Sequence, residues 1–188
     1  TTGLLAIALQ AEGVDARSWQ GWQAGIRTDG AHGKARVEEI DGSRLIERME
    51  IGQVPVVAGF QGIGPRDRIT TLGRGGSDLS AVAVAAAVRA DRCDIYTDVD
   101  GIYTTDPRIV PRARKLAAVA YEEMLELASV GAKVLQTRSV ELAMKAKVRV
   151  QVLSSFEDKP GSMVVDEDEI VEKPLVTGVA YSRDEAKV

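Results

Sequence analysis

The segment from Arg74 to Asp78, with the sequence RGGSD, contains the residue types that could bind an anion. It leads directly into an alanine-rich stretch that is typical of a helix. Free N–H groups at a helix start, together with the positive end of the helix dipole, favour a bound phosphate or carboxylate. Glycines let such a ligand approach the backbone closely. No Gly-Lys-Ser/Thr follows these glycines, so the segment is not a P-loop.

The charged residues of this segment suggest an amino-acid ligand. Arg74 offers a planar guanidinium that matches a carboxylate, and Asp78 could hold an ammonium group. Gly75, Gly76 and Ser77 lie between them. A second interpretation is that Ser77 only caps the helix and that Arg74 lies in solvent. The local pattern is consistent with both interpretations.

A second chemically suggestive segment is YTDVDGIYTTDPR, residues 96–108, which carries three acids and ends in Arg108. Asp98 stands at the end of a predicted strand, where open α/β sheets bind their ligands. Acids in that place can hold Mg²⁺ or orient a lysine, and Arg108 can meet a phosphate. Asp100 and Gly101 alone are typical of a turn. The whole segment has more acids than a turn requires, which favours a site.

Three further residues have reactive side chains. Lys133 stands near a helix start, where the dipole prefers acids, so it either reaches an anion such as a phosphoryl oxygen or is an ordinary surface lysine. His32 lies in a predicted turn, where a surface histidine is expected rather than a general base. Cys93 precedes a strand and is expected to be a small buried residue rather than a nucleophile.

The predicted elements around these residues alternate between helix and strand, which indicates an α/β fold. Helices are expected in the stretch ending near Gly13, from Ser43 as N-cap to a stop at Gly52, after the RGGSD segment, and on both sides of Gly131. VPVVAGF reads as a strand buried on both faces, and CDIYTDVDG as a strand that pairs with it in parallel across the helix. RVQVLSSF and GSMVV read as further strands. Residues 101–116 read as a long ordered loop, and such loops are usually functional.

Bulk properties limit the class of protein. The chain has 188 residues, 45% of them hydrophobic and 28% charged, with a net charge of −4, which fits one soluble globular domain rather than a nucleic-acid-binding protein. No apolar run approaches the roughly 20 residues of a membrane span. The lone cysteine excludes a disulfide within the chain. We expect a cytoplasmic enzyme or binding domain, and the acidic run DEDEIVEKP reads as a solvated linker.

Several motifs together resemble the aspartokinases of the amino-acid kinase family, nearest to the lysine- and threonine-regulated bacterial type. They are GFQG, TTLGRGGSDLSA, CDIYTDVDGIYTTDPRIV and YEEMLELASVGAKVLQTRSVELA, with QAGIRTD, HGKARV and VTGVAYSRDEAKV in addition. The resemblance covers nearly the whole chain. It implies a three-layer α/β/α sandwich with a mainly parallel sheet, and ATP-dependent phosphorylation of the side-chain carboxylate of L-aspartate, the first step toward lysine, threonine and methionine.

The resemblance also implies roles for individual residues. It implies that aspartate is contacted by Arg74, Gly75, Gly76 and Ser77. The interpretation of the residues themselves adds Asp78 to this set. Asp98 would be catalytic by organising positive groups around the phosphoryl group. ATP and Mg²⁺ would be required, and ATP would be bound by Thr97, Asp98, Tyr103, Thr104, Thr105, Asp106, Pro107, Arg108, Lys133 and Val134. No residue of this chain is assigned to a metal.

The chain departs from the family pattern at its beginning. The family opens with a Lys-Phe/Tyr-Gly-Gly strand that holds the phosphates, and no such motif occurs here. We therefore expect residues 1–172 to be the C-terminal part of a kinase domain truncated at its N-terminus. Residues 173–188 would be a linker and the first strand, Val176 to Tyr181, of a regulatory ACT domain. The fragment alone should have little or no activity in a coupled assay. The full-length protein should be an oligomer with lysine or threonine as effectors.

Two other functions remain open at this stage. One is a different amino-acid kinase, acting on glutamate, acetylglutamate or a nucleoside monophosphate. The other is a non-catalytic domain that binds nucleotide or partner chains, which the missing lysine motif would support if the protein begins here. The LGRGGSD and EEMLELASVGAKVLQ motifs favour aspartate.

Overall fold

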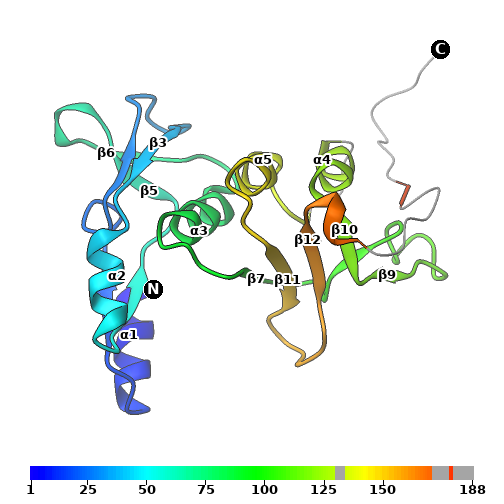
Figure 1. Ribbon diagram of the computed structural model, residues 1–188, viewed down its shortest axis with the longest axis horizontal. Helices are drawn as coiled ribbons and strands as arrows, with labels where there is room; N and C mark the ends of the chain where they lie inside the picture. The colour runs from blue at the N-terminus through cyan, green and yellow to red at the C-terminus, as the bar shows by residue number, and fades with distance from the viewer. Residues whose placement is uncertain (130–133, 171–177, 180–188) are drawn as a thin grey trace. The chain divides into compact units, whose positions relative to one another are not determined.

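The computed structural model describes residues 1–129, 134–170 and 178–179. The chain forms two compact units, Thr1–Ala90 and Asp91–Val188 (Figure 1). No helix among the described residues is long and apolar enough to cross a bilayer.

The first unit contains two sheets and the helices that pack on them. β1 and β4 form a parallel pair, and the other sheet has the strand order β3-β2-β5-β6. Its elements are α1 (Thr2–Ala11), β1 (Ala16–Trp19), β2 (Ile26–Thr28), β3 (Val37–Ile40), α2 (Ser43–Glu50), β4 (Val54–Val57), β5 (Gln61–Ile63), the short 3₁₀ helix η1 (Pro65–Asp67), β6 (Ile69–Thr71) and α3 (Gly76–Ala87).

Two apolar clusters hold these elements in place. Ala6 of α1 packs with Ala16 of β1 and Val56 of β4, so α1 lies on the β1–β4 pair. Ile26 of β2 and Leu45 of α2 are buried together, and Val84 and Val88 at the end of α3 pack against them. The start of α3, which carries the RGGSD residues, therefore belongs to a helix anchored at its other end.

The second unit is built on one mixed sheet with the strand order β10-β12-β11-β7. Helices α4 and α5 lie side by side on one face of it (Figure 1). Its elements are β7 (Cys93–Thr97), β8 (Ile102–Tyr103), β9 (Lys115–Leu116), β10 (Ala118–Ala120), α4 (Tyr121–Ser129), α5 (Thr137–Ala146), β11 (Val150–Ser154), β12 (Ser162–Val165) and the 3₁₀ helix η2 (Glu167–Glu169).

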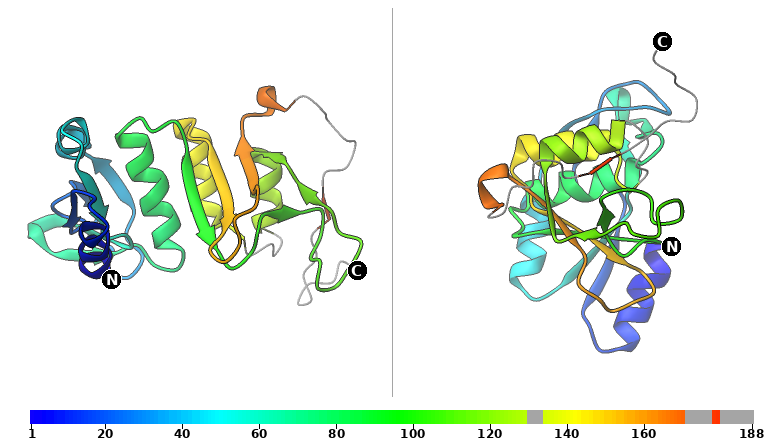
Figure 2. Two further views of the ribbon diagram at one scale, coloured as in Figure 1. Left: turned by 90° about the horizontal axis from the view of Figure 1, so that it is seen from below. Right: turned by 90° about the vertical axis from the view of Figure 1, so that its right-hand side faces the viewer.

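The pairing of β7 with β11 is the longest ladder, with five residue pairs from Cys93↔Val150 to Thr97↔Ser154. The two strands run side by side in the same direction (Figure 2). Burial alternates along β11, with Val150 and Val152 fully inside, which is the period of a strand with one covered face. Because the strands are parallel, their carboxyl ends meet at one edge of the sheet.

Two predictions about local structure are wrong. Gly42, not Ser43, is the N-cap residue of α2, because the carboxylate of Asp41 already accepts the Ser43 N–H at 3.0 Å. A side chain at position 42 would also lie 2.6 Å from the Ala87 carbonyl oxygen. Residues 101–116 are not only loop, since β8 and β9 pair within them.

The predicted strand 54–60 is shorter and less buried than expected. It forms β4, in which Val56 is buried but Val54 is 42% exposed. Its partner is β1, whereas β7 pairs with β11, so the expected parallel partners are also wrong. The pattern of apolar residues predicted which segments form strands, but it carried no information on which strands pair.

Candidate functional site

The glycine segment, residues 71–80, leads from β6 into α3 through two left-handed glycines. Gly73 has φ of 80° and Gly75, the N-cap residue of α3, has φ of 70°. Backbone of this kind strains any residue with a Cβ atom. Arg74 stands between the two glycines, is exposed, and has no ion-pair partner among the described residues. Its guanidinium is therefore available to a ligand at the start of α3.

Ser77 does not cap α3, because the N-cap position belongs to Gly75 and the helix has no side-chain cap. The Ser77 side chain is exposed, and within the described residues its hydroxyl makes one long contact, of 3.4 Å, to the carboxylate of Asp78. The interpretation of Ser77 as a mere cap is wrong. The exposure of Arg74 fits both interpretations of this segment. Arg74, Ser77 and Asp78 lie at one helix start, and their role in an amino-acid site stays a prediction.

Phe60 is a feature of this region that the sequence did not reveal. Its φ is 69°, in the left-handed region that is costly for a bulky residue. The Phe60 N–H donates to the Ser80 hydroxyl at 2.8 Å, and that hydroxyl donates to the Gly76 carbonyl at 2.6 Å. A Cβ atom on Gly76 would lie 2.9 Å from the Phe60 ring. The aromatic ring, half exposed, is thereby held against the first residue of α3, and only the flanking glycines of GFQG hinted at it.

The acidic segment, residues 96–108, begins at the carboxyl end of β7. Asp98 directly follows the strand and is exposed, and the Thr97 hydroxyl donates to its Oδ1 at 3.2 Å. The Ser155 N–H donates to the Thr97 carbonyl at 2.8 Å, which fixes the end of β7 beside the end of β11. Asp98 has no ion-pair partner within the described part of the chain. Its carboxylate is therefore free to meet a ligand at this sheet edge.

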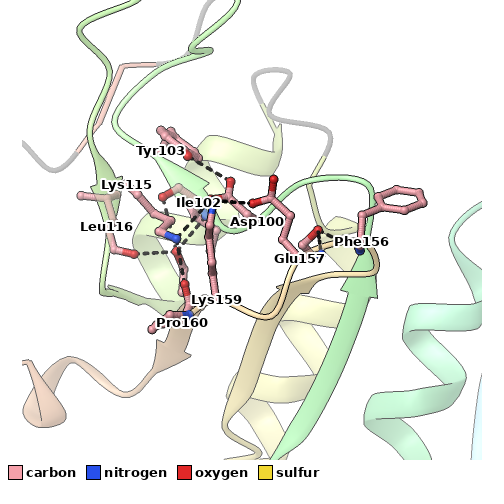
Figure 3. Close-up of polar contacts among 11 residues, drawn as sticks. Asp100, Ile102, Tyr103, Lys115, Leu116, Phe156, Glu157, Lys159 and Pro160 are labelled. Carbon is pink, nitrogen blue, oxygen red and sulfur yellow. Dashed lines mark hydrogen bonds and ion pairs between the residues drawn. The ribbon is translucent and has the colours of Figure 1, made fainter.

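The other two acids of the segment are already engaged. Asp100 accepts hydrogen bonds from the Tyr103 hydroxyl at 2.9 Å and from the Lys115 ammonium at 3.1 Å (Figure 3). Burial alone would raise the pKa of Asp100, but the bonds from Lys115 and Tyr103 outweigh it and the pKa lies below its usual value. Asp106 accepts from Arg108 through Nε at 3.1 Å and Nη2 at 2.9 Å, and these bonds lower its pKa.

The remaining predicted nucleotide residues lie along the same segment. Thr104 anchors its middle, because its N–H donates to the Arg114 carbonyl at 2.9 Å and its hydroxyl accepts the Arg114 N–H at 3.0 Å. Thr105 is half-buried, and Pro107 is exposed. The Thr104 carbonyl accepts the Val179 N–H at 2.7 Å.

Two predictions fall wholly or partly outside the described residues. Lys133 lies outside them, and its neighbour Val134 is half-buried in the turn before α5. Of the predicted ACT strand, only Gly178 and Val179 are described. The assignment of residues 173–188 to an ACT domain stays a prediction.

Among the described residues, no three His, Cys, Asp or Glu side chains are grouped to hold a metal ion. Asp100 and Asp106 have cationic partners, which leaves Asp98 as the acid of the segment that could serve Mg²⁺. Magnesium is usually bound by one or two carboxylates together with substrate phosphates. Asp98 fits that mode of binding, while a site made only of protein ligands does not fit these residues.

Comparison with known proteins gives concordant results. The profile of the Amino acid kinase family matches residues 2–154. The aspartate kinase of Pseudomonas putida (strain KT2440) is 54% identical over 189 residues, which cover 100% of this chain and 46% of the relative. Aspartokinase III of E. coli in complex with aspartate and ADP superposes with a TM-score of 0.80 at 37% identity, covering 88% of this chain and 38% of that one.

The same E. coli enzyme in complex with lysine and aspartate superposes with a TM-score of 0.79 at 37% identity, covering 89% of this chain and 39% of that one. This chain spans less than half the length of each of these relatives. The similarity confirms the predicted α/β fold class and the amino-acid kinase fold. The chain therefore belongs to the amino acid kinase family.

Proposed function

We propose that this chain is part of an aspartokinase, which transfers the terminal phosphoryl group of ATP to the side-chain carboxylate of L-aspartate and forms 4-phospho-L-aspartate. The observation that carries the proposal is the exposed guanidinium of Arg74 at the start of α3, which has no ion-pair partner in the part of the chain that the structure describes. A cation placed there, with Asp78 in the first helical turn, suits a ligand with both a carboxylate and an ammonium group.

The reaction requires position and charge more than reactive groups. A carboxylate of aspartate, already ionised at neutral pH, attacks the terminal phosphorus, and the bond to the leaving ADP oxygen breaks. No general base is needed, because the nucleophile carries no proton. The main obstacle is repulsion between the carboxylate and the polyphosphate, which cations and backbone N–H groups offset.

The residues of the glycine segment would bind the acceptor. Arg74 would pair with a carboxylate of aspartate, with the N–H groups of Gly75, Gly76 and Ser77 beside it. Asp78 would hold the amino group. The half-exposed ring of Phe60, fixed against Gly76, forms an apolar wall that limits where an acceptor can lie.

The residues of the acidic segment would bind the nucleotide. Tyr103 to Arg108, together with Thr97, Lys133 and Val134, would line the ATP site. Asp98 would organise positive charge around the phosphoryl group. Mg²⁺, when bound with ATP, neutralises phosphate charge, and Asp98 is the residue that would hold it.

The wider assignment follows from the same proposal. The full-length protein would be a cytoplasmic, oligomeric enzyme that supplies the pathway to lysine, threonine and methionine. Lysine or threonine would act as effector. The E. coli relative in complex with lysine and aspartate supports this part of the proposal.

A pair of variants in the full-length protein tests the acceptor assignment. Arg74→Ala should raise the KM for aspartate by about tenfold or more, because a charged hydrogen bond contributes roughly 1.5–3 kcal/mol. The KM for ATP should change little. Arg44→Ala, at an exposed arginine of α2, is the matched control. An unchanged aspartate KM in Arg74→Ala would show that the glycine segment does not bind the acceptor.

A further inference from the structure

Lys115 joins three separate parts of the second unit. It stands directly opposite Tyr103 in the β8–β9 pair. Its ammonium group donates to Asp100 at 3.1 Å and to the Pro160 carbonyl, in the turn between β11 and β12, at 2.7 Å (Figure 3). The Lys115 side chain is only 29% exposed and that of Asp100 30%. An ion pair that is this sheltered is screened less by solvent than an exposed one.

Tyr103 depends on this ion pair for its orientation. Its hydroxyl donates to Oδ1 of Asp100, while Lys115 takes Oδ2. Both oxygens of one carboxylate are thus used, one to hold an aromatic ring and one to hold a cation. Because Tyr103 directly precedes Thr104, the carboxylate also fixes where the chain enters residues 104–108.

Ser162 supports the same stretch from the adjacent strand. It is fully buried in β12, and its hydroxyl accepts the Ile102 N–H at 2.8 Å and donates to the Leu116 carbonyl at 2.5 Å. A Cβ atom on Gly101 would lie 2.6 Å from that hydroxyl. One serine therefore joins β8 and β9 to the main sheet beside the ion pair.

We infer that Asp100 and Lys115 are positioning residues for the nucleotide: their ion pair holds Tyr103 and the following residues 104–108 in the arrangement that binds ATP. This inference rests on the proposed function for the identity of the ligand. The pair has a second effect, because Lys115 neutralises a carboxylate close to the segment that would receive an anionic polyphosphate. Loss of the cation alone should therefore harm binding more than loss of both charges.

The test compares three variants in the full-length protein. Lys115→Met should raise the KM for ATP by about tenfold, because it leaves a sheltered carboxylate unpaired. The KM for aspartate should stay within about twofold. The double variant Asp100→Asn with Lys115→Met should recover a large part of the loss, since it removes the unpaired charge as well. Lys115→Arg keeps the positive charge, so its KM for ATP should lie closer to that of the unaltered protein than the KM of Lys115→Met does.

The matched control is Lys145→Met, at an exposed lysine of α5 that has no ion pair among the described residues. Its KM for ATP should match that of the unaltered protein. Equal ATP constants for Lys115→Met and Lys145→Met would overturn the inference. So would a parallel rise of both Michaelis constants with a lower melting temperature, because that pattern indicates a purely structural role.

Binding of ADP separates this inference from the proposed function. Calorimetric titration with ADP and Mg²⁺ needs no acceptor, so it can be made even if aspartate is not phosphorylated. An unaltered protein that binds ADP but does not phosphorylate aspartate would refute the proposed acceptor. A dissociation constant for ADP that is the same in Lys115→Met and in the unaltered protein would refute the positioning role.

Discussion

At the scale of single residues, the start of α3 depends on the absence of a side chain at position 76. A Cβ atom there would lie 2.8 Å from Cβ of Leu72 and 2.9 Å from the Phe60 ring. Phe60 cannot move away easily, because its N–H donates to the Ser80 hydroxyl and its carbonyl accepts the Leu72 N–H. The strained Phe60 conformation and the glycine at position 76 are therefore two parts of one arrangement.

Gly76→Ala should lower the free energy of unfolding by about 1–3 kcal/mol, the usual cost of forcing extra atoms into a packed site. The better helix propensity of alanine offsets only part of this cost. Denaturant unfolding measures the change. Ser77→Ala, at the exposed neighbouring position, should shift it by less than about 0.5 kcal/mol. A Gly76→Ala protein as stable as Ser77→Ala would contradict the close packing of Phe60 on α3.

Tyr121, the first residue of α4, gives a prediction about pH. It is 2% exposed, and its hydroxyl donates to the Val148 carbonyl at 2.9 Å. Burial and then the charges of Glu169 and Asp166 raise its pKa to about 12. An exposed tyrosine ionises near pH 10. The folded state therefore holds this proton more tightly, and the stability that Tyr121 contributes is complete below about pH 10 and is lost as the pH rises through 12.

Urea unfolding between pH 9 and 12 tests this assignment. The free energy of unfolding should fall more steeply with pH in the unaltered protein than in Tyr121→Phe, which has no phenolic proton to lose. At neutral pH the same variant should be less stable by about 1 kcal/mol because it lacks one hydrogen bond. Identical slopes in the two proteins would mean that Tyr121 ionises as an exposed residue does.

At the scale of elements, β8 and β9 are attached to the rest of the second unit by polar groups as well as by apolar burial. They are two residues each, and Ile102 of β8 is fully buried. Ser162 connects both strands to β12. The placement of the acidic segment therefore rests in part on a serine that sequence analysis did not single out.

Ser162→Ala should lower the free energy of unfolding by about 1–3 kcal/mol, because it leaves the Ile102 N–H without its partner in a buried place. Amide hydrogen exchange at Ile102 should become faster. Ser129→Ala, which removes an exposed hydroxyl at the end of α4, is the control and should have little effect. Unchanged exchange at Ile102 would show that another group satisfies this N–H.

The sequence predicted which elements form better than how they associate. The helix before Gly13, the helix after RGGSD and strands β7, β11 and β12 were all expected, because period and glycine stops are local signals. Partners such as β1 for β4 depend on contacts between distant residues, which periodicity does not encode. Arg74 is exposed at the helix start, and its contact with aspartate stays a prediction. The left-handed Phe60 and the pairing of Lys115 with Asp100 depend on contacts between residues distant in the sequence, which local patterns do not encode.

At the scale of the whole molecule, the two proposed halves of the reaction come from different units. The glycine segment belongs to the first unit and the acidic segment to the second. Variants of the two segments should therefore act on different substrates. Variants of the glycine segment should act on aspartate, and variants of residues 100–108 should act on ATP.

Asp98 should be the residue whose loss costs the most turnover. Asp98→Ala in the full-length protein should lower kcat by orders of magnitude while the melting temperature stays the same, since the exposed carboxylate makes few contacts. Asp158→Ala, at an exposed acid in the turn after β11, is the control. A kcat for Asp98→Ala close to that of the control would remove Asp98 from the catalytic role.

The central claim is that the acceptor is L-aspartate and that its carboxylate receives the phosphoryl group. The most direct measurement incubates the full-length protein with ATP and Mg²⁺ and with aspartate, glutamate, acetylglutamate or UMP in turn, and follows ADP release together with trapping of an acyl phosphate by hydroxylamine. Our account predicts ADP release and a trapped hydroxamate with aspartate far above those with the other acceptors. Preferred turnover of another acceptor, or ADP release with aspartate but no hydroxamate, would contradict it.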